Sequence, residues 1–187
     1  EEARRKKVGG KVLGSGDALM AQFGWPGISV DYRHGLGKLD LGGRFTFNYG
    51  FEGIPTINPG IKLQGVLRLS VLDTGKVSLA LQFDPGFAFY FRDYFRMAIL
   101  MPVAAILGIH VGDAIAIHLG FDMPMAVFIV PTTYFELPFQ FGGGLEYRVD
   151  SHLSLTLDTR FGPDLLINRW TDTYFSFKTL VGIGYRL

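Results

Sequence analysis

Apolar and polar residues alternate along most of this chain. In the stretch 39–49 the odd positions are leucine, glycine, phenylalanine or tyrosine, whereas the even positions include Asp40, Arg44 and Asn48. The pattern recurs in 61–71, 139–149, 153–161 and 178–187. A period of two residues is typical of a β-strand whose two faces meet different surroundings. It predicts an all-β protein whose apolar face consists of odd-numbered residues from residue 39 onward.

Tight turns recur at an almost constant spacing, with centres near residues 36, 74, 112 and 151. Longer breaks lie between them, near 26, 51–60, 92–97, 131–134 and 162–172. Two strands between successive tight turns predict a closed antiparallel up-and-down barrel of ten strands. Both chain ends should lie at the end with the short turns. Eight strands is the alternative if 11–34 does not form a hairpin.

The apolar face stays on odd-numbered residues from residue 39 onward, and this constancy also predicts the turn lengths. A three-residue hairpin loop preserves the parity of the outward positions, whereas a two-residue loop reverses it. We expect three-residue loops at 73–75, 111–113 and 150–152, with Gly75 in a left-handed conformation. At Pro26-Gly27 the parity reverses, because Phe23 and Trp25 precede it and even-numbered apolar residues follow. A two-residue loop is expected there.

Alternation alone fits either a soluble barrel with an apolar interior or a membrane barrel with an apolar exterior. Ten strands with about five large apolar residues each would overfill a small barrel, whose interior takes only a few layers of side chains. The even face combines charged residues with glycine and alanine, which suits a crowded polar lumen. The run 97–109 carries no charge on either face, and a solvent-exposed wall of that kind would be unusual. The odd face is therefore expected to contact lipid, and the run 97–109 to give an apolar lumen patch or a plug contact.

Composition narrows the class further. The net charge of +1 gives no reason to expect nucleic acid as a partner. The chain has no cysteine, which excludes disulfides and thiolate metal sites. The longest apolar run is shorter than the roughly 20 residues of a membrane-spanning helix. Residues 1–10 are charged from the start and are expected to be a solvated leader, with 11–187 as a single barrel domain.

Aromatic residues are expected to form two bands, as in the girdles of transmembrane β-barrels. Tyr32, Tyr147 and Tyr185 belong near the short-turn end. The band near the long-loop end comprises Trp25, Tyr49, Phe91, Trp170 and Tyr174.

The last strand would have to pair with the first, since lipid cannot satisfy an open sheet edge. Its closing residues, "GIGYRL", resemble the C-terminal signal of bacterial outer-membrane β-barrel proteins, with Gly182, Tyr185 and Leu187 at the matching positions. Leu187 stands where that family usually has phenylalanine. The resemblance implies a Gram-negative outer-membrane location after removal of a signal peptide that this chain does not contain. It also implies outer-membrane lipid and the barrel-assembly machinery as partners.

Lumen-facing charges are expected to pair with one another, with bases in excess. Besides Asp31, Arg33 and Lys62, this expected network comprises Asp40, Arg44, Arg68, Glu146, Arg148, Asp158, Arg160, Lys178 and Arg186. In particular, Arg44, Arg68, Arg148 and Arg160 should pair with Asp40, Glu146 and Asp158. Glu146 should lie opposite position 156.

Two functions remain open at this level. The first is a non-enzymatic barrel, either a narrow porin-like pore or a closed membrane scaffold. The second is a lipid-modifying or proteolytic barrel enzyme that uses His118 on the lumen face, oriented by Asp122 four residues later. The non-enzymatic function is favoured, with no catalytic residue assigned, no metal and no cofactor. The sequence gives no basis for an oligomeric state.

Overall fold

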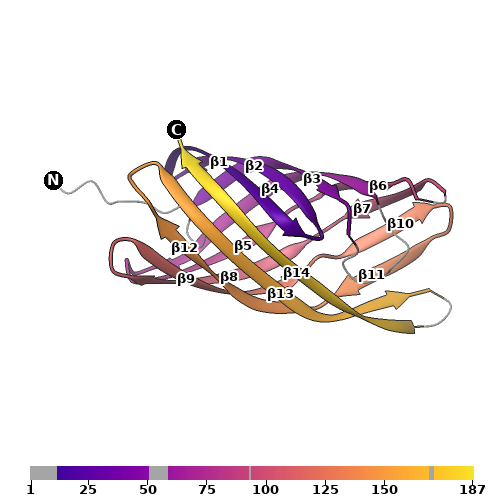
Figure 1. Ribbon diagram of the computed structural model, residues 1–187. Coiled ribbons are helices and arrows are strands. Elements are labelled where there is room, and N and C mark those ends of the chain that lie inside the picture. The colour runs from indigo at the N-terminus through magenta and orange to yellow at the C-terminus, as the bar shows by residue number, and fades with distance from the viewer. Residues whose placement is uncertain (1–11, 51–58, 93, 169–170) are drawn as a thin grey trace.

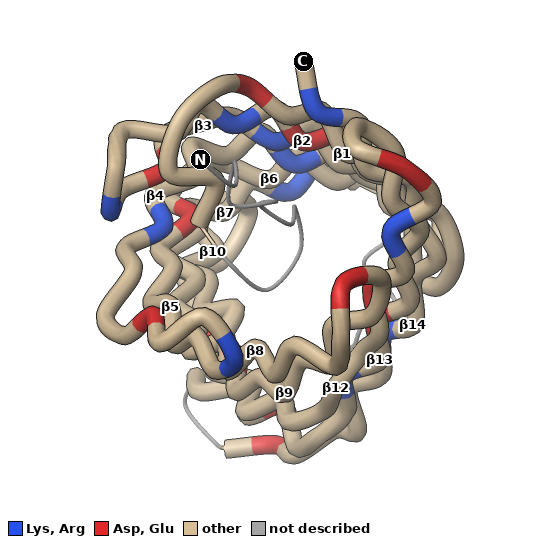
Figure 2. Tube along the Cα trace, turned by 90° about the vertical axis from the view of Figure 1, so that its left-hand side faces the viewer, with Lys and Arg blue, Asp and Glu red and all other residues tan. Residues whose placement is uncertain are grey.

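The computed structural model describes residues 12–50, 59–92, 94–168 and 171–187, and this part of the chain is entirely β-structure. Ten strands pair antiparallel around a closed ring, in which β1 meets β14 (Figures 1 and 2). In order around the ring they are β1 (Ser15–Trp25), β2 (Gly27–Leu36), β3 (Leu39–Asn48), β4 (Gly60–Asp73), β5 (Val77–Phe83), β8 (Val103–Val111), β9 (Ile115–Met123), β12 (Gln140–Arg148), β13 (Leu153–Ile167) and β14 (Thr171–Arg186).

Ten strands are therefore confirmed, and residues 15–36 form the β1–β2 hairpin on which that prediction depended. In the described residues, no helix is long and apolar enough to cross a membrane. The predicted leader, 1–10, lies outside the described residues. Ser15 pairs with Leu36 beside the β2–β3 turn, and Arg186 pairs with Ala18. The two ends of the described chain thus lie at the short-turn end, as predicted.

Four short strands lie beyond the ring, where they continue ring strands past a proline. They are β6 (Gly86–Tyr90), β7 (Arg96–Leu100), β10 (Ala126–Val130) and β11 (Tyr134–Pro138). The register does not change across the breaks: Phe83 pairs with Val103 on one side, and Gly86 pairs with Leu100 on the other. Proline lacks the N–H that a ladder requires, so each of these neighbouring strands is interrupted without being redirected.

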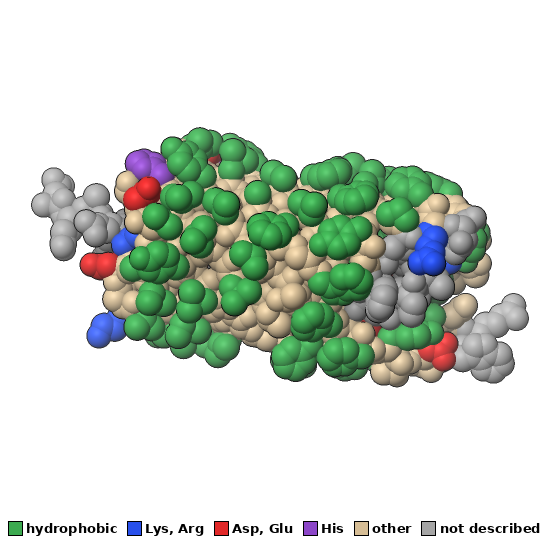
Figure 3. Space-filling model, in the orientation of Figure 1, with side chains coloured by type: hydrophobic (Ala, Val, Ile, Leu, Met, Phe, Trp, Pro, Cys, Tyr) green, Lys and Arg blue, Asp and Glu red, His purple; other side chains and the backbone are tan. Residues whose placement is uncertain are grey.

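The outer surface of the barrel is apolar along most of its length. From residue 39 onward its large exposed apolar side chains are odd-numbered, apart from Leu72 and Tyr94. On β2 the even-numbered Ile28, Val30 and Tyr32 are exposed instead, whereas on β1 the exposed ones are the odd-numbered Leu19 and Phe23. Figure 3 shows, on one face, apolar side chains between charged groups that lie near the two ends. The predicted alternation therefore describes the inner and outer faces correctly.

The turns explain the phase, although three of them differ from expectation. Phe23 pairs with Ile28, which leaves four residues, 24–27, in place of the two-residue loop expected at Pro26-Gly27. Leu36 pairs with Leu39, which leaves two residues, 37–38. Both turns contain an even number of residues, so each reverses the parity. Residues 150–152 form the predicted three-residue loop, since Val149 donates its backbone N–H to Leu153. The loop expected at 111–113 lies one residue later, at 112–114, because Val111 still pairs with Ile115.

The loop expected at 73–75 differs from expectation in its length. Asp73 pairs with Ser78, which leaves four residues in the turn, and Gly75 has the predicted left-handed backbone with φ of 87°. A four-residue loop would reverse the parity. A β-bulge between Ser70 and Leu72 adds one residue to β4 and restores it.

Asp150 stabilises the turn at 150–152. Its Oδ1 accepts the backbone N–H of His152 at 2.7 Å and of Leu153 at 2.8 Å. These hydrogen bonds, led by the one from His152, lower the pKa of the Asp150 carboxyl below its ordinary value, because they favour its charged form.

Candidate functional site: the charged lumen

Two groups of charged side chains occupy the lumen at about the level of the proline breaks. The first group extends over β2 to β5 and centres on Arg44. The Nη2 of Arg44 lies 2.7 Å from Oδ2 of Asp31, and its Nη1 lies 2.8 Å from Oδ2 of Asp84. Arg33, from β2, lies 3.5 Å from Asp31. Forked pairing with carboxylates is the favourable way to keep a guanidinium inside a barrel.

Arg68 belongs to the same group through an amide. Its Nε donates to the Oε1 of Gln82 at 2.7 Å, and the amide nitrogen of Gln82 donates to Asp84 at 2.6 Å. Gln82 and Asp84 were not predicted as site residues. Their even numbers place them on the lumen face of the strand that ends before Pro85, and that parity is the signal that could have identified them.

The second group joins β9, β13 and β14 and centres on Arg160. Its Nη2 lies 2.9 Å from Oδ2 of Asp158, and its Nε lies 3.1 Å from Oδ2 of Asp122. Lys178 approaches the same Asp122 oxygen at 4.0 Å. Arg160 is only 3% exposed, so these two carboxylates provide the charge that compensates a buried guanidinium.

Glycine provides the space for this second group. A Cβ on Gly120 would lie 2.6 Å from Nη2 of Arg160, and a Cβ on Gly144 would collide with the imidazole of His118. Larger residues at these two positions would displace the side chains that the lumen holds. The small residues of the even face are therefore part of the charged group's packing.

His118 does not contact Asp122 as the catalytic hypothesis expected. Its Nε2 lies 2.9 Å from Oδ2 of Asp158, whereas Asp122 interacts with Arg160 and Lys178. The Nδ1 of His118 is buried without a hydrogen-bond partner in the described part of the chain. A carboxylate-held imidazole can act as a base, but no hydroxyl of the described residues is hydrogen-bonded to this one. The pair expected from sequence spacing is thus not formed.

The remaining predicted network residues differ in their surroundings. Asp40 is fully buried, lies opposite Arg68 in the β3–β4 register and accepts the backbone N–H of Leu13 at 2.9 Å. Glu146 is 1% exposed and pairs in register with Thr156, as expected. Near the short-turn end, Arg148 donates to the backbone carbonyl of Asp113, and Arg186 donates to that of Ser15 at 2.5 Å. The predicted single network is therefore divided into two central groups with outlying members.

Beyond the proline breaks the lumen wall becomes apolar on one side. Inward side chains of β6, β7 and β10 form a buried cluster of Ala88, Tyr90, Ala98, Leu100, Ala126 and Phe128, against which Tyr134 of β11 packs. The ring of Phe128 stacks on Tyr90, with centroids 5.9 Å apart, and on Tyr134 at 4.3 Å. Two of the six cluster residues, Ala98 and Leu100, belong to the uncharged run 97–109. That run therefore contributes to an apolar lumen patch, one of the two outcomes expected for it.

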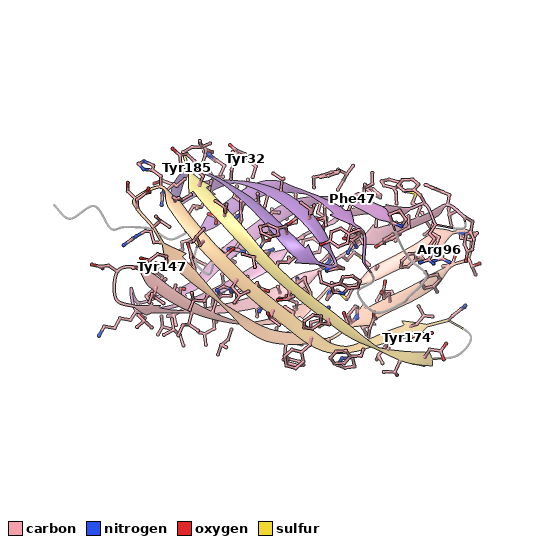
Figure 4. The ribbon with its side chains drawn as sticks, viewed as in Figure 1. Tyr32, Phe47, Arg96, Tyr147, Tyr174 and Tyr185 are labelled. Atoms are coloured by element: carbon pink, nitrogen blue, oxygen red, sulfur yellow. The ribbon has the colours of Figure 1, made fainter. Side chains whose placement is uncertain are left out.

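Four of the predicted band residues lie toward the two ends, whereas Trp25 lies opposite Thr179, about midway along β14. Figure 4 shows Tyr32, Tyr147 and Tyr185 toward the short-turn end and Tyr174 toward the opposite end. Tyr49 and Phe91 are exposed, and Tyr49 makes an edge contact with Trp25 at 6.3 Å between ring centroids. Trp170 lies outside the described residues. The predicted assembly residues Gly182, Tyr185 and Leu187 lie on or directly after β14, where Tyr185 pairs with Leu19.

A cavity of about 210 Å³ lies between the two charged groups, with Pro102 and Pro124 in its wall. In the described residues, no cluster of three or more histidine, aspartate or glutamate side chains is arranged to hold a metal ion. In comparisons with known proteins, no family model and no curated protein matches the chain.

Proposed function

We propose that this protein is an integral β-barrel of the bacterial outer membrane whose charged lumen provides a narrow path for small anions. The observation that carries the proposal is the division of the barrel into an apolar exterior and an interior containing paired charges. In water such an exterior would be a very large exposed apolar surface. In lipid it is the surface that a transmembrane barrel requires.

The lumen supports a narrow path, because its side chains fill much of the cross-section. Barrels of roughly eight strands are just filled by their side chains, whereas wide aqueous channels occur at about 16 strands. Arg44, Arg68 and Arg160 extend into this lumen and are held by acceptors there. Cationic residues outnumber acidic ones around the central cavity, which favours anions over cations.

Insertion is the second part of the proposal. The resemblance of the closing strand to the outer-membrane signal supports recognition by the barrel-assembly machinery through Gly182, Tyr185 and Leu187. The pairing of β14 with β1, which leaves no open edge in the ring, is consistent with insertion into lipid.

Conductance of the refolded protein in a planar lipid bilayer tests this function. We expect stepwise insertion and a small or intermittent conductance with a weak preference for chloride over potassium. Replacing Arg68 and Arg160 together by alanine should widen the path and raise the conductance at least about twofold. The matched control is Lys38→Ala with Lys76→Ala, since both lysines are exposed in turns.

The outcomes separate the alternatives. A large and steady conductance of the unmodified protein would contradict a narrow lumen. Silence of both the unmodified protein and the double-arginine variant, after insertion has been verified, would favour the closed scaffold. Equal effects of the lumen and turn substitutions would show that the arginines do not limit the path.

A further inference from the structure

One polar cluster lies on the outer face of the barrel, away from the charged lumen. Asp17 of β1 is opposite His34 of β2 in the strand register, and the next outward pair, farther from the β2–β3 turn, is Leu19 and Tyr32. The Oη of Tyr32 donates to Oδ1 of Asp17 at 2.6 Å, and the same oxygen lies 2.7 Å from Nδ1 of His34. Asp17, Tyr32 and His34 thus form one connected group, which we name the Asp17 cluster.

Asp17 differs from the other charged residues of the ring in the side of the wall that it occupies. In the described residues, every other aspartate, glutamate, lysine and arginine of the ten ring strands occupies an inward position. Asp17 has outward parity, together with Leu19 and Phe23 of the same strand, which are 40% and 57% exposed. The side chain of Asp17 is 34% exposed, and that of His34 is 48% exposed. A charge on the lipid-facing surface of a barrel is unfavourable unless it lies near the headgroups.

The cluster lies at the level where lipid headgroups are expected. Tyr32 and Tyr185 are exposed on either side of Leu19, in the tyrosine band of the short-turn end (Figure 4). Such bands lie at the boundary between hydrocarbon and headgroups. Asp17 and His34 are one outward position beyond that band, toward the β2–β3 turn. The cluster therefore faces the headgroup region of the leaflet at this end.

The Asp17 cluster has acceptors that the described chain does not use. A carboxylate only accepts hydrogen bonds, so Nδ1 of His34 carries the proton of their bond, and Nε2 of the neutral imidazole is an acceptor. Oδ2 of Asp17 accepts no hydrogen bond from the described residues, and His34 is the only ion-pair partner of Asp17 among them. Two acceptors, one of them anionic, are therefore available to a ligand. A primary ammonium group complements them, because it carries a positive charge and three donors.

We propose that the Asp17 cluster binds the headgroup of an ethanolamine phospholipid. The ammonium group would pair with Asp17 and donate to His34. The acyl chains would lie along the exposed apolar side chains of β1 and β2, which are Leu19, Phe23 and Val30. The inference rests on the proposed membrane insertion and goes beyond it, because it names a lipid that the barrel retains at the short-turn end.

Other ligands satisfy fewer of these features. A choline headgroup has the positive charge but no donor, so it cannot hydrogen-bond to Asp17 or His34. A glycerol headgroup has donors, but its lipid carries a net negative charge that the carboxylate repels. A divalent cation would need further ligands, and no group of three or more histidine, aspartate or glutamate side chains in the described residues is arranged to hold one. A lysine of a partner protein would have to displace lipid from the apolar surface around the cluster.

Native mass spectrometry of the refolded full chain in nonionic detergent micelles provides the test. The micelles contain equimolar palmitoyl-oleoyl lipids with ethanolamine, choline and glycerol headgroups, and the lipid that stays bound to the protein is measured. We expect the ethanolamine lipid to be retained at least about threefold more than either of the others, as for one exposed ion pair. Asp17→Asn should remove this preference. Asp113→Asn is the matched control, because Asp113 is an exposed aspartate in a short turn at the same end of the barrel.

A series of modified lipids keeps the inference falsifiable if Asp17→Asn does not fold. Each methyl group added to the ammonium nitrogen removes one donor and keeps the charge, until the choline headgroup has none. Retention by the unmodified protein should decrease along this series. Equal retention of all its members, or equal losses in the two aspartate variants, would overturn the inference. Preferred retention of the glycerol lipid that a chelator abolishes would indicate a bridging divalent cation and would overturn it as well.

The result can be separated from that of the proposed function. Bilayer conductance by a protein with no preference for the ethanolamine lipid would refute the headgroup site alone. A preference for this lipid in micelles, by a protein that never inserts into a bilayer, would refute the proposed function alone.

Discussion

At the scale of single residues, small side chains determine where the long ones can lie. Arg160 reaches Asp158 and Asp122 because Gly120 presents no Cβ to its guanidinium. Gly120 has no positive φ, so the requirement at this position is space and not backbone conformation. A glycine inside a strand normally weakens it, and this one is favourable through the ion pairs that it permits.

Gly120→Ala should therefore destabilise the barrel. The new Cβ would lie 2.6–3.0 Å from three guanidinium atoms of Arg160, which would move the side chain away from its carboxylates. We expect a loss of about 1–3 kcal/mol in the free energy of unfolding, the range for a buried polar group that loses its partner. Urea unfolding in lipid vesicles, followed by tryptophan fluorescence, measures it.

Gly43→Ala provides the control for this prediction. Gly43 faces outward on β3, and the nearest atom to its added Cβ is 3.7 Å away. Its free energy of unfolding should change by no more than about 0.5 kcal/mol. Equal losses for the two variants would show that Gly120 is not needed for the position of Arg160.

At the scale of elements, the β4–β5 hairpin combines two irregularities whose effects on parity cancel. The four-residue turn shifts the outward face by one position, and the bulge between Ser70 and Leu72 shifts it back. As a result two neighbouring residues, Val71 and Leu72, are both exposed, at 54% and 46%. A regular strand would expose one of them and bury the other.

Cysteine substitution at three successive positions tests this arrangement. The chain contains no cysteine, so Ser70→Cys, Val71→Cys and Leu72→Cys can each carry a single bimane label. In vesicles of brominated lipid, labels at 71 and 72 should both be quenched strongly and the label at 70 weakly. Strong quenching at 71 with weak quenching at 72 would indicate regular alternation and contradict the bulge.

At the scale of the whole molecule, closure of the ring depends on one pairing between distant parts of the chain. β1 and β14 lie together in a register that places Leu19 opposite Tyr185 and Phe23 opposite Val181. If the short strands beyond the prolines are left out, every other neighbouring pair in the ring joins strands that follow one another along the chain. The β1–β14 contact therefore determines whether the sheet has open edges.

A disulfide across this contact should form in one register only. Directly opposed residues of antiparallel strands have Cα atoms about 4.5–5.5 Å apart, within the range that a disulfide bridges. Leu19→Cys with Tyr185→Cys should oxidise readily and raise the urea midpoint of unfolding. The control, Leu19→Cys with Val181→Cys, differs by four residues along β14 and should stay reduced. Gel mobility with and without reductant measures both, and crosslinking of the control pair alone would contradict the register.

The sequence by itself determined the features that depend on neighbouring residues. Alternation in stretches such as 39–49 specified strands and their outward face, because side-chain direction in a strand follows residue parity. The regular spacing of tight turns specified ten strands. The uncharged run 97–109 specified an apolar wall, and the parity of Arg44, Arg160 and Asp158 specified a charged interior.

Only the tertiary structure decided which charges meet. His118 was paired with Asp122 on sequence spacing, yet Asp158 from β13 reaches it, with β12 lying between their strands. Asp84, which directly follows β5, reaches Arg44 of β3 although β4 lies between these two strands in the ring. Such contacts depend on the stagger and curvature of the closed barrel and on the space that glycine leaves. Those quantities are set by all ten strands together, so no local pattern along the chain encodes them.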